Sequence, residues 1–291
     1  MSSESAPESE DARAASLIAG RYRLEEALGA GGATSVHRAV DQLLGRNVAV
    51  KLFRPGAVSE EDVLGNEARL LAALNHHALV TLLDAGIDAG GADGPHVYLV
   101  LELVEGTDLR RRLESGALQL RTAAYIGADL ADALDYIQGR GIVHRDVKPE
   151  NVLLPNDDAL RRPRAKLADF GIAALVSASG GTRATARAGA YLSPEQAAGA
   201  PGGPSSDIYS LGLVILESLT RRVAFPASVT DSAFGRLHRN PEIPRSLPAG
   251  WRNLLALMTA QDGASRPTPA EAAAAFRQLA AEAELSAGPC P

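Results

Sequence analysis

Residues 144–151 read His-Arg-Asp-Val-Lys-Pro-Glu-Asn, and residues 169–171 read Asp-Phe-Gly. Asp146 can accept the proton of an attacking hydroxyl group. Lys148 lies two residues further along, and in an extended backbone its side chain points the same way and can balance charge on a moving phosphoryl group. An ordinary solvated loop would not require the whole octet and the second motif in this order and spacing. The pattern therefore indicates phosphoryl transfer.

Two further residues of these stretches carry oxygen atoms suited to a metal ion. Asn151 and Asp169 are eighteen positions apart in the sequence. Mg²⁺ prefers one or two protein oxygens together with phosphates and water. The sequence therefore predicts a magnesium site that uses both residues.

A lysine stands at the end of an apolar run. Residues 48–51 read Val-Ala-Val-Lys, which places the ammonium group of Lys51 at the edge of the core. Glu67 lies in the apolar band of a helix that we expect to begin at Ser59, where an unpaired charge would be costly. We therefore expect Lys51 and Glu67 to pair; the alternative is that both side chains extend to solvent on separate faces.

Three glycines, Gly29, Gly31 and Gly32, lie in a turn between two strand-like runs. Missing side chains let backbone N–H groups approach phosphate oxygens closely, although a plain hairpin turn would contain the same glycines. The run after the turn is extended rather than helical, and no Gly-Lys-Ser/Thr follows. The turn is therefore neither a dinucleotide-binding fingerprint nor a P-loop.

The chain changes character near residue 104. Before it, alternating or β-branched runs predict strands, interrupted by the helix from Ser59; after it, amphipathic patterns predict helices. A small strand-rich half and a larger helical half indicate two lobes joined near residues 102–106, and a cleft between lobes is where ligands usually bind. The expected strands span residues 21–28, 35–40, 47–53, 79–83 and 96–101, and the expected helices span residues 120–138, 206–219, 251–258 and 268–284.

The composition excludes several classes of protein. The chain has 291 residues, of which 46% are apolar, enough to bury a large core. Its net charge is −6 and it has no basic stripe, so we expect no nucleic-acid partner. The single cysteine, Cys290, can form neither an internal disulfide nor a cysteine metal cluster, which fits a cytoplasmic location. Its apolar runs fall short of the ~20 residues that span a membrane, so we expect no membrane segment in this chain.

From about Arg21 to Ala281, these motifs resemble the Hanks-type protein kinases, most closely the Ser/Thr kinases of bacteria. The lysine of the octet is the Ser/Thr variant of that motif. The resemblance implies an α+β, bilobal protein-kinase fold: a small N-lobe with an antiparallel sheet and one main helix, and a larger, mainly helical C-lobe. The expected parts are a disordered acidic tail at 1–20, a kinase domain at 21–283 with lobes at 21–103 and 104–283, and a tail at 284–291.

The resemblance also implies a role for each site residue, with ATP and Mg²⁺ as cofactors. Asp146 is the catalytic base with Lys148 beside it, Asn151 and Asp169 bind the metal, and Lys51 binds the α/β-phosphates while Glu67 pairs with it. Adenine should lie between Ala49 and Leu153, with Leu101 as the gatekeeper. The residues expected to bind the nucleotide are Gly29, Gly31, Val36, Ala49, Lys51, Glu67, Glu102, Val104 and Leu153.

Other matches concern the scaffold. Glu195, in Ser193-Pro194-Glu195, resembles the glutamate that pairs with an arginine matching Arg266, and Asp207 resembles the buried aspartate that supports the catalytic loop. The sequence departs from the family pattern at two positions. Thr34 stands where the glycine-rich motif of the family has its third glycine. Ala188 replaces a threonine whose hydroxyl in the family normally bridges the catalytic aspartate and lysine.

The leading hypothesis is an active Ser/Thr protein kinase that phosphorylates protein hydroxyls. We expect it to phosphorylate its own activation loop, at Thr182 or Thr185, with Arg145 next to Asp146 contributing to a basic pocket for the phosphate. A homodimer is a candidate arrangement for this reaction. The main alternative is a nucleotide-binding pseudokinase, or a weakly active kinase, that acts as a signalling scaffold.

Overall fold

The computed structural model describes residues 17–31, 34–56, 72–89, 95–156, 162–169, 188–226, 237 and 239–287. The chain forms two compact units. The first contains the described residues up to Leu74 together with Thr81–Leu103, and the second contains Asn75–Val80 and the described residues from Val104 onward. Three expected features lie outside the described residues: the tail up to residue 16, the helix from Ser59 with Glu67, and the activation-loop threonines. The expected tail at 1–20 is wrong at its end, because Leu17 and Ile18 form a strand that pairs with residues 22 and 23.

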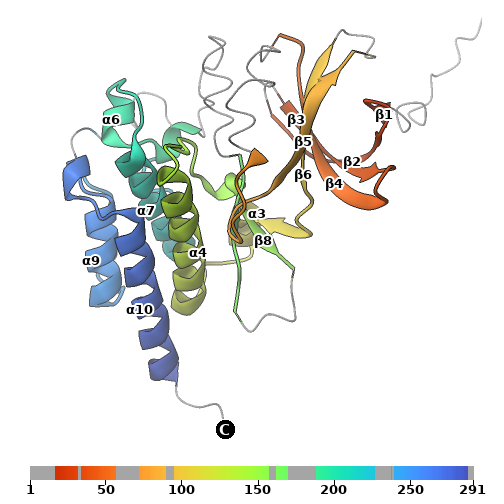
Figure 1. Ribbon diagram of the computed structural model, residues 1–291. Helices are drawn as coiled ribbons and strands as arrows, with labels where there is room; N and C mark the ends of the chain where they lie inside the picture. The colour runs from red at the N-terminus through yellow and green to blue at the C-terminus, as the bar shows by residue number, and fades with distance from the viewer. Residues whose placement is uncertain are drawn as a thin grey trace, which may run out of the picture. The chain divides into compact units, whose positions relative to one another are not determined.

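The first unit is an antiparallel sheet with the strand order β1-β2-β3-β4-β6-β5 (Figure 1). One face buries a cluster that includes Tyr22, Ala39, Val48, Val50 and Val100. This face follows from alternation, since residues two apart on a strand point the same way. The strands are β1 (Leu17–Ile18), β2 (Tyr22–Ala30), β3 (Thr34–Asp41), β4 (Arg46–Phe53), β5 (Leu82–Asp88) and β6 (His96–Glu102).

An ion pair fastens the start of β2 to the end of β3. The Arg21 guanidinium donates to both carboxylate oxygens of Asp41, at 2.8 and 2.7 Å. The backbone N–H groups of Leu43 and Leu44 donate to the same carboxylate at 3.1 and 3.2 Å. Hydrogen bonding with Arg21 lowers the pKa of Asp41 to about 2, against the opposing effect of burial.

The expected strand at residues 79–83 is wrong in its position. The strand β5 begins at Leu82 and continues to Asp88. Leu79 instead forms an isolated parallel bridge with Leu167, and the N–H of Val80 donates to the carbonyl of Leu167 at 3.0 Å. The residues expected to form one strand are therefore divided. Leu79 and Val80 contact Leu167 in the second unit, whereas the strand of the first unit starts at Leu82.

The second unit consists mainly of helices and also contains a small three-stranded sheet of order β7-β8-β9 (Figure 1). Neither this sheet nor helix α3 is predicted by the sequence patterns. The elements are β7 (Gly106–Asp108), α3 (Leu109–Glu114), α4 (Leu120–Gln138), η2 (Pro149–Asn151), β8 (Val152–Pro155), β9 (Lys166–Leu167), η3 (Ala188–Tyr191), α6 (Pro194–Ala197), α7 (Pro204–Thr220), α9 (Ala249–Met258), η4 (Gly263–Ser265) and α10 (Pro269–Ala287).

The long helices agree with the apolar patterns. Helix α4 has the expected bounds, and α7 is buried on every side from Ser206 to Ser218. A capping box starts α10: the N–H of Thr268 donates to the Glu271 carboxylate at 2.8 Å, and the N–H of Glu271 donates to the Thr268 hydroxyl at 3.3 Å. Helix α10 continues to Ala287, beyond the domain end expected at residue 283. None of the described helices is long and apolar enough to cross a membrane.

Helices α4 and α10 lie side by side in Figure 1. Their contact requires a glycine, because a Cβ atom at Gly127 would lie 2.8 Å from the ring of the fully buried Phe276. On the other side of α10, the ring of Trp251 from α9 lies 6.0 Å from that of Phe276. These contacts form part of the apolar core of the second unit.

Candidate active site

The structure brings the central residues of the octet together as predicted. Lys148 Nζ lies 2.6 Å from Asp146 Oδ2. Asn151 Nδ2 donates to the backbone carbonyl of Asp146 at 2.8 Å and to Asp146 Oδ2 at 3.0 Å. Both the Asp146 carboxylate and the Lys148 ammonium remain partly exposed. A carboxylate held by two donors and open to solvent can meet an incoming hydroxyl in a fixed orientation.

Asp207 binds the backbone at the start of the octet, which confirms its predicted scaffold role. Its carboxylate accepts the backbone N–H of His144 at 2.9 Å and that of Arg145 at 2.8 Å. The side chain is buried in α7, and burial raises the pKa of Asp207 against the opposing effect of these bonds. Arg145, which supplies one of the two N–H groups, has a left-handed backbone with a φ of +66°.

His144 connects the octet to the segment before Asp169. Its Nδ1 accepts the N–H of Asp146 at 3.2 Å, so its Nε2 carries the proton and donates to the carbonyl of Ala168 at 3.0 Å. The N–H of Ala168 in turn donates to the carbonyl of Asn151 at 2.8 Å. Asp169 has a φ of +63°. These bonds fix the backbone of the two predicted metal-binding residues relative to each other.

In the first unit, register gathers several predicted nucleotide-binding residues on one face of the sheet. Gly29 pairs with Val36, Val36 pairs with Lys51, and Ala49 pairs with Leu101. Directly paired residues share a face, as do residues two apart, so these five side-chain positions lie on the face opposite Val48 and Val50. Lys51 is buried there, with 5% of its surface exposed.

The turn after β2 is a hairpin in which Gly31 N–H donates to the carbonyl of Thr34 at 2.8 Å. A Cβ atom at Gly29 would meet no atom within 4 Å, and one at Gly31 would make only ordinary contacts with Thr34. Neither glycine has a positive φ. Neither packing nor backbone conformation therefore requires a glycine at position 29. A glycine that served only to form the hairpin would be required by one of the two.

The remaining predicted residues occupy the strand ends. Glu102 closes β6, where its N–H donates to the carbonyl of Thr81 at 2.9 Å and its carboxylate accepts the N–H of Thr81 at 2.9 Å. Val104 follows β6 and is half-buried. Leu153 lies on β8, where it pairs with Asp108 and Lys166.

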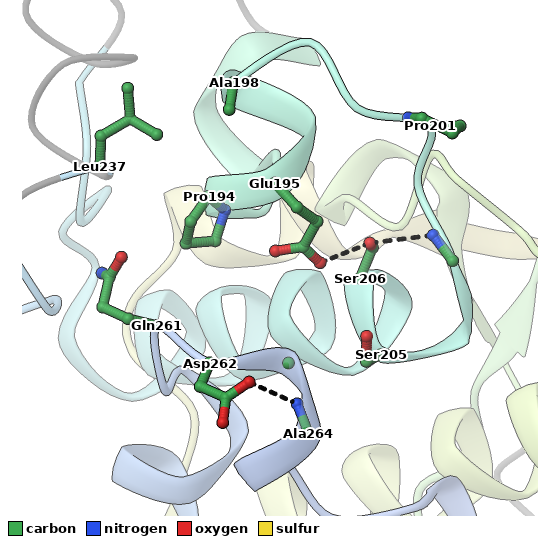
Figure 2. A pocket seen from close by; sticks show the side chains of 12 residues that line it. Pro194, Glu195, Ala198, Pro201, Ser205, Ser206, Leu237, Gln261, Asp262 and Ala264 are labelled. Atoms are coloured by element: carbon green, nitrogen blue, oxygen red, sulfur yellow. Dashed lines mark hydrogen bonds between the residues drawn. The ribbon is translucent and has the colours of Figure 1, made fainter.

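The predicted pair of Glu195 and Arg266 is confirmed. The guanidinium donates to both carboxylate oxygens, at 2.7 and 2.9 Å, and Ser206 Oγ donates at 2.6 Å. Burial would raise the pKa of Glu195, but the bonds from Arg266 and Ser206 outweigh it and lower the pKa to about 2. Figure 2 shows Glu195 beside Ser206 at a hollow of about 610 Å³ between α6, α7 and η4. None of the predicted catalytic or nucleotide-binding residues lines this hollow.

A charged cluster next to the octet is not predicted by the sequence patterns. Arg110 of α3 binds Glu150, Glu217 and Tyr191. Glu217 could have indicated this cluster from the sequence, because it is a carboxylate inside the apolar run of α7 and a buried charge requires a partner. The identity of that partner depends on where α3 lies, which no local pattern gives.

A sequence model of the protein kinase domain matches residues 22–276. This chain belongs to the protein kinase family. Serine/threonine-protein kinase PknL of Mycobacterium tuberculosis is 35% identical over 279 residues, covering 91% of this chain and 67% of the relative. PknA of the same species is 35% identical over 257 residues, covering 86% and 58%. PknB of Mycolicibacterium smegmatis is 40% identical over 216 residues, covering 72% and 34%.

These relatives confirm the predicted resemblance to bacterial Ser/Thr kinases. Family membership, together with the strand-rich and helical units, also confirms the bilobal kinase fold class. Kinases of this family generally use ATP and a divalent metal ion. Among the described residues, no three His, Cys, Asp or Glu side chains gather as a metal site. A magnesium site with two protein oxygens does not need such a group.

Proposed function

We propose that this kinase transfers the γ-phosphoryl group of ATP to serine and threonine hydroxyls of proteins. The observation that carries the proposal is the arrangement of Lys148 and Asn151 around the Asp146 carboxylate, at 2.6 and 3.0 Å. Asp146 accepts the proton of the attacking hydroxyl. Lys148 holds Asp146 in place and neutralises charge on the phosphoryl oxygens as they approach.

The donor set of the octet suits the implied metal. Asn151 uses its amide nitrogen on Asp146, which leaves its amide oxygen as the acceptor for a cation. Asn151 and Asp169 would therefore hold Mg²⁺, which when bound neutralises charge on the phosphate oxygens. The bonds through Ala168 and His144 keep Asn151 and Asp169 in a fixed backbone register for this task.

The nucleotide is proposed to bind along the sheet face that carries Gly29, Val36, Ala49 and Lys51. The open space beside Gly29 suits phosphate oxygens that approach the backbone closely. Lys51 binds the α/β-phosphates, and its pairing with Glu67 stays a prediction. Gly31, Glu102, Val104 and Leu153 complete the proposed set.

The test is the substitution Asp146→Asn, assayed with Mg-ATP and an acceptor protein. Loss of the base should reduce turnover at least ~100-fold, with ATP affinity little changed. Asp132→Asn is the matched control, because Asp132 pairs only with Arg277 at the surface of α4 among the described residues. Near-normal turnover in Asp146→Asn would refute the assignment. Binding of ATP by the unmodified protein without any transfer would favour the pseudokinase alternative.

We also propose autophosphorylation at Thr182 or Thr185, which a homodimer would allow between two copies. The support is Arg145, which is exposed and whose guanidinium bonds the carbonyl of Gly202 at 3.4 Å through Nε. Its remaining N–H groups suit a phosphate. Mass spectrometry of fresh and phosphatase-treated protein should find the loop phosphate only in the fresh sample, with higher activity there. Equal activity in both samples would contradict the mechanism.

The domain is proposed to extend from Leu17, where β1 joins the sheet, to the end of α10, with the boundary between the lobes at 103/104. We also propose that the protein is cytoplasmic. Limited proteolysis should then remove the tails first and leave a resistant fragment that starts near Leu17, because Ile18 lies in the core of the first unit. Early cleavage within β2 or α10 would place the domain boundaries elsewhere.

A further inference from the structure

Arg110, the second residue of α3, binds side chains from three other elements. Its Nε donates to Glu150 Oε1 in η2 at 3.0 Å. Its Nη1 binds Glu217 of α7, and its Nη2 donates to the hydroxyl of Tyr191 at the end of η3. The Tyr191 hydroxyl donates to the other oxygen of Glu217. One planar guanidinium therefore joins two short turns to the central helix.

Both turns border the proposed catalytic residues. Glu150 stands next to Asn151, whose amide holds Asp146. The turn η3 begins at Ala188, and an alanine side chain has no group that could donate a hydrogen bond to the catalytic loop. In the part of the chain that the structure describes, the hydrogen-bonded link between η3 and the octet runs through Arg110.

The chemistry of the cluster makes this link rigid. Glu217 is 3% exposed, so it needs the guanidinium as a partner. Burial would lower the pKa of Arg110, but the bond to Glu217 outweighs it and the pKa is raised, so the guanidinium stays charged. Burial raises the pKa of Tyr191, so its hydroxyl keeps the proton that it donates. The fork of N–H groups on arginine then fixes three acceptors in one plane.

Glu150 depends on the same residue. Its second oxygen, Oε2, is buried and accepts no hydrogen bond from the described residues. The bond from Arg110 Nε is therefore what orients this side chain within η2.

We propose that Arg110 is a positioning residue that holds the 188–191 turn in register with Asp146 and Lys148, a link that the side chain at position 188 cannot make. The inference rests on the proposed catalytic roles of Asp146 and Lys148. It concerns acceptor positioning, so ATP binding and the reaction of ATP with water should not depend on it.

The variant Tyr191→Phe removes one hydroxyl and keeps the ring packing. We expect kcat toward an acceptor protein to fall about ten- to a hundredfold, as for the loss of a charge-assisted hydrogen bond in the transition state. The KM for ATP and the hydrolysis of ATP without acceptor should stay near their original values. The thermal midpoint should fall by only a few degrees, because one buried oxygen of Glu217 loses its donor. Tyr125→Phe is the matched control, because it removes a hydroxyl that binds Glu284 between α4 and α10.

A second pair of variants guards against misfolding. Arg110→Lys keeps the positive charge beside Glu217 but loses the fork, and should show the same split between acceptor phosphorylation and ATP hydrolysis. Arg111→Lys is its control, since Arg111 is the exposed neighbour that pairs with Asp108. If Tyr191→Phe and Arg110→Lys lose both activities in proportion to a lowered thermal midpoint, Arg110 is only structural and the proposal is overturned.

The variant Ala188→Thr tests the part assigned to position 188. A hydroxyl there offers an independent link, so it should raise kcat more in the Tyr191→Phe background than in the original protein. An equal gain in both backgrounds, or no gain in either, overturns this part. Asp146→Asn is measured alongside: if it remains active, the proposed function itself fails, whereas an inactive Asp146→Asn with a normal Tyr191→Phe refutes only the role of Arg110.

Discussion

The Asp146 carboxylate shows how much of a catalytic geometry three neighbouring residues can set. Lys148 contributes a charged partner and Asn151 a neutral one, and both bind the same oxygen, Oδ2. In the proposed mechanism, the other oxygen, Oδ1, is the one that accepts the proton of the substrate hydroxyl. Hydrogen bonds to charged groups contribute about 1.5 to 3 kcal/mol each, so the rotamer of Asp146 is strongly determined before any substrate binds.

Gly29→Ala separates a binding role for the glycine turn from a structural one. The new methyl group has open space in the folded protein, so the thermal midpoint should stay the same or rise slightly, because alanine restricts the unfolded chain. The methyl group would keep phosphate oxygens away from the backbone, and losing one bond to a charged group should weaken ATP binding about tenfold or more. Isothermal titration with Mg-ATP measures this.

The control for this experiment is Gly203→Ala, where an added Cβ also meets no atom within 4 Å. It should leave the ATP dissociation constant unchanged. An unchanged constant in Gly29→Ala as well would mean that the turn is a plain hairpin.

Single residues were predictable where one strand or one motif sets their place. Alternation along β4 puts Lys51 and Ala49 on one face, and the octet is continuous in sequence. Arg110 was not predictable, because its partners lie 40, 81 and 107 positions away. The role of Glu67 is still a prediction, as it lies outside the described residues.

At the scale of elements, the closest approach between helices α4 and α10 is set by Gly127 and Phe276. Gly127→Ala would gain about 1 kcal/mol in helix propensity. It would also press a methyl group to 2.8 Å from a ring that is fully buried and cannot move aside. Overpacking of this kind costs about 1 to 3 kcal/mol, so we expect a net loss of stability and a thermal midpoint lowered by a few degrees.

A double-mutant cycle identifies the cause. Phe276→Leu alone should destabilise by leaving space, while Phe276→Leu combined with Gly127→Ala should be more stable than the sum of the single changes predicts, because the methyl group fills that space. Strict additivity in thermal unfolding would show that the two residues do not meet as described.

Elements were predictable in proportion to their length. Helix α4, with 19 residues, carries a pattern long enough to fix its bounds. The strands β8 and β9, with four and two residues, carry none, and they exist because of pairing across the chain. The same reason displaced β5, since the bridge between Leu79 and Leu167 takes up residues that a local pattern assigns to a strand.

At the scale of the whole molecule, the described part of each unit contains a carboxylate with a pKa of about 2, Asp41 in the first and Glu195 in the second. A folded-state pKa below the usual value means that the stabilisation is present above the unfolded pKa and is lost as pH falls through the folded one. For Glu195 that window runs from 4.5 down to about 2. Asp207 acts in the opposite direction, because its pKa is raised by burial.

Glu195→Gln isolates this contribution, since Asp207 is common to both proteins. The variant should be less stable at neutral pH, where Arg266 loses its charged partner. The difference in unfolding free energy should shrink between pH 4.5 and 2 by at most about 1.4 kcal/mol per pH unit. Urea unfolding followed by the fluorescence of Trp251, the single tryptophan, reports on the second unit. A difference that stays constant with pH would mean that the charge of Glu195 is not what stabilises the pair.

The left-handed backbone at Arg145 and Asp169, with φ of +66° and +63°, has an evolutionary consequence. A residue with a Cβ atom loses roughly 1 to 2 kcal/mol in this conformation, and glycine would not. Directed evolution for heat resistance alone should therefore accumulate glycine or asparagine at these two positions. The selected variants should have a higher thermal midpoint but lack kinase activity. Selection for kinase activity would have to oppose that drift, because Asp169, the proposed metal ligand, and Arg145, the proposed phosphate-binding residue, both occupy this costly backbone conformation.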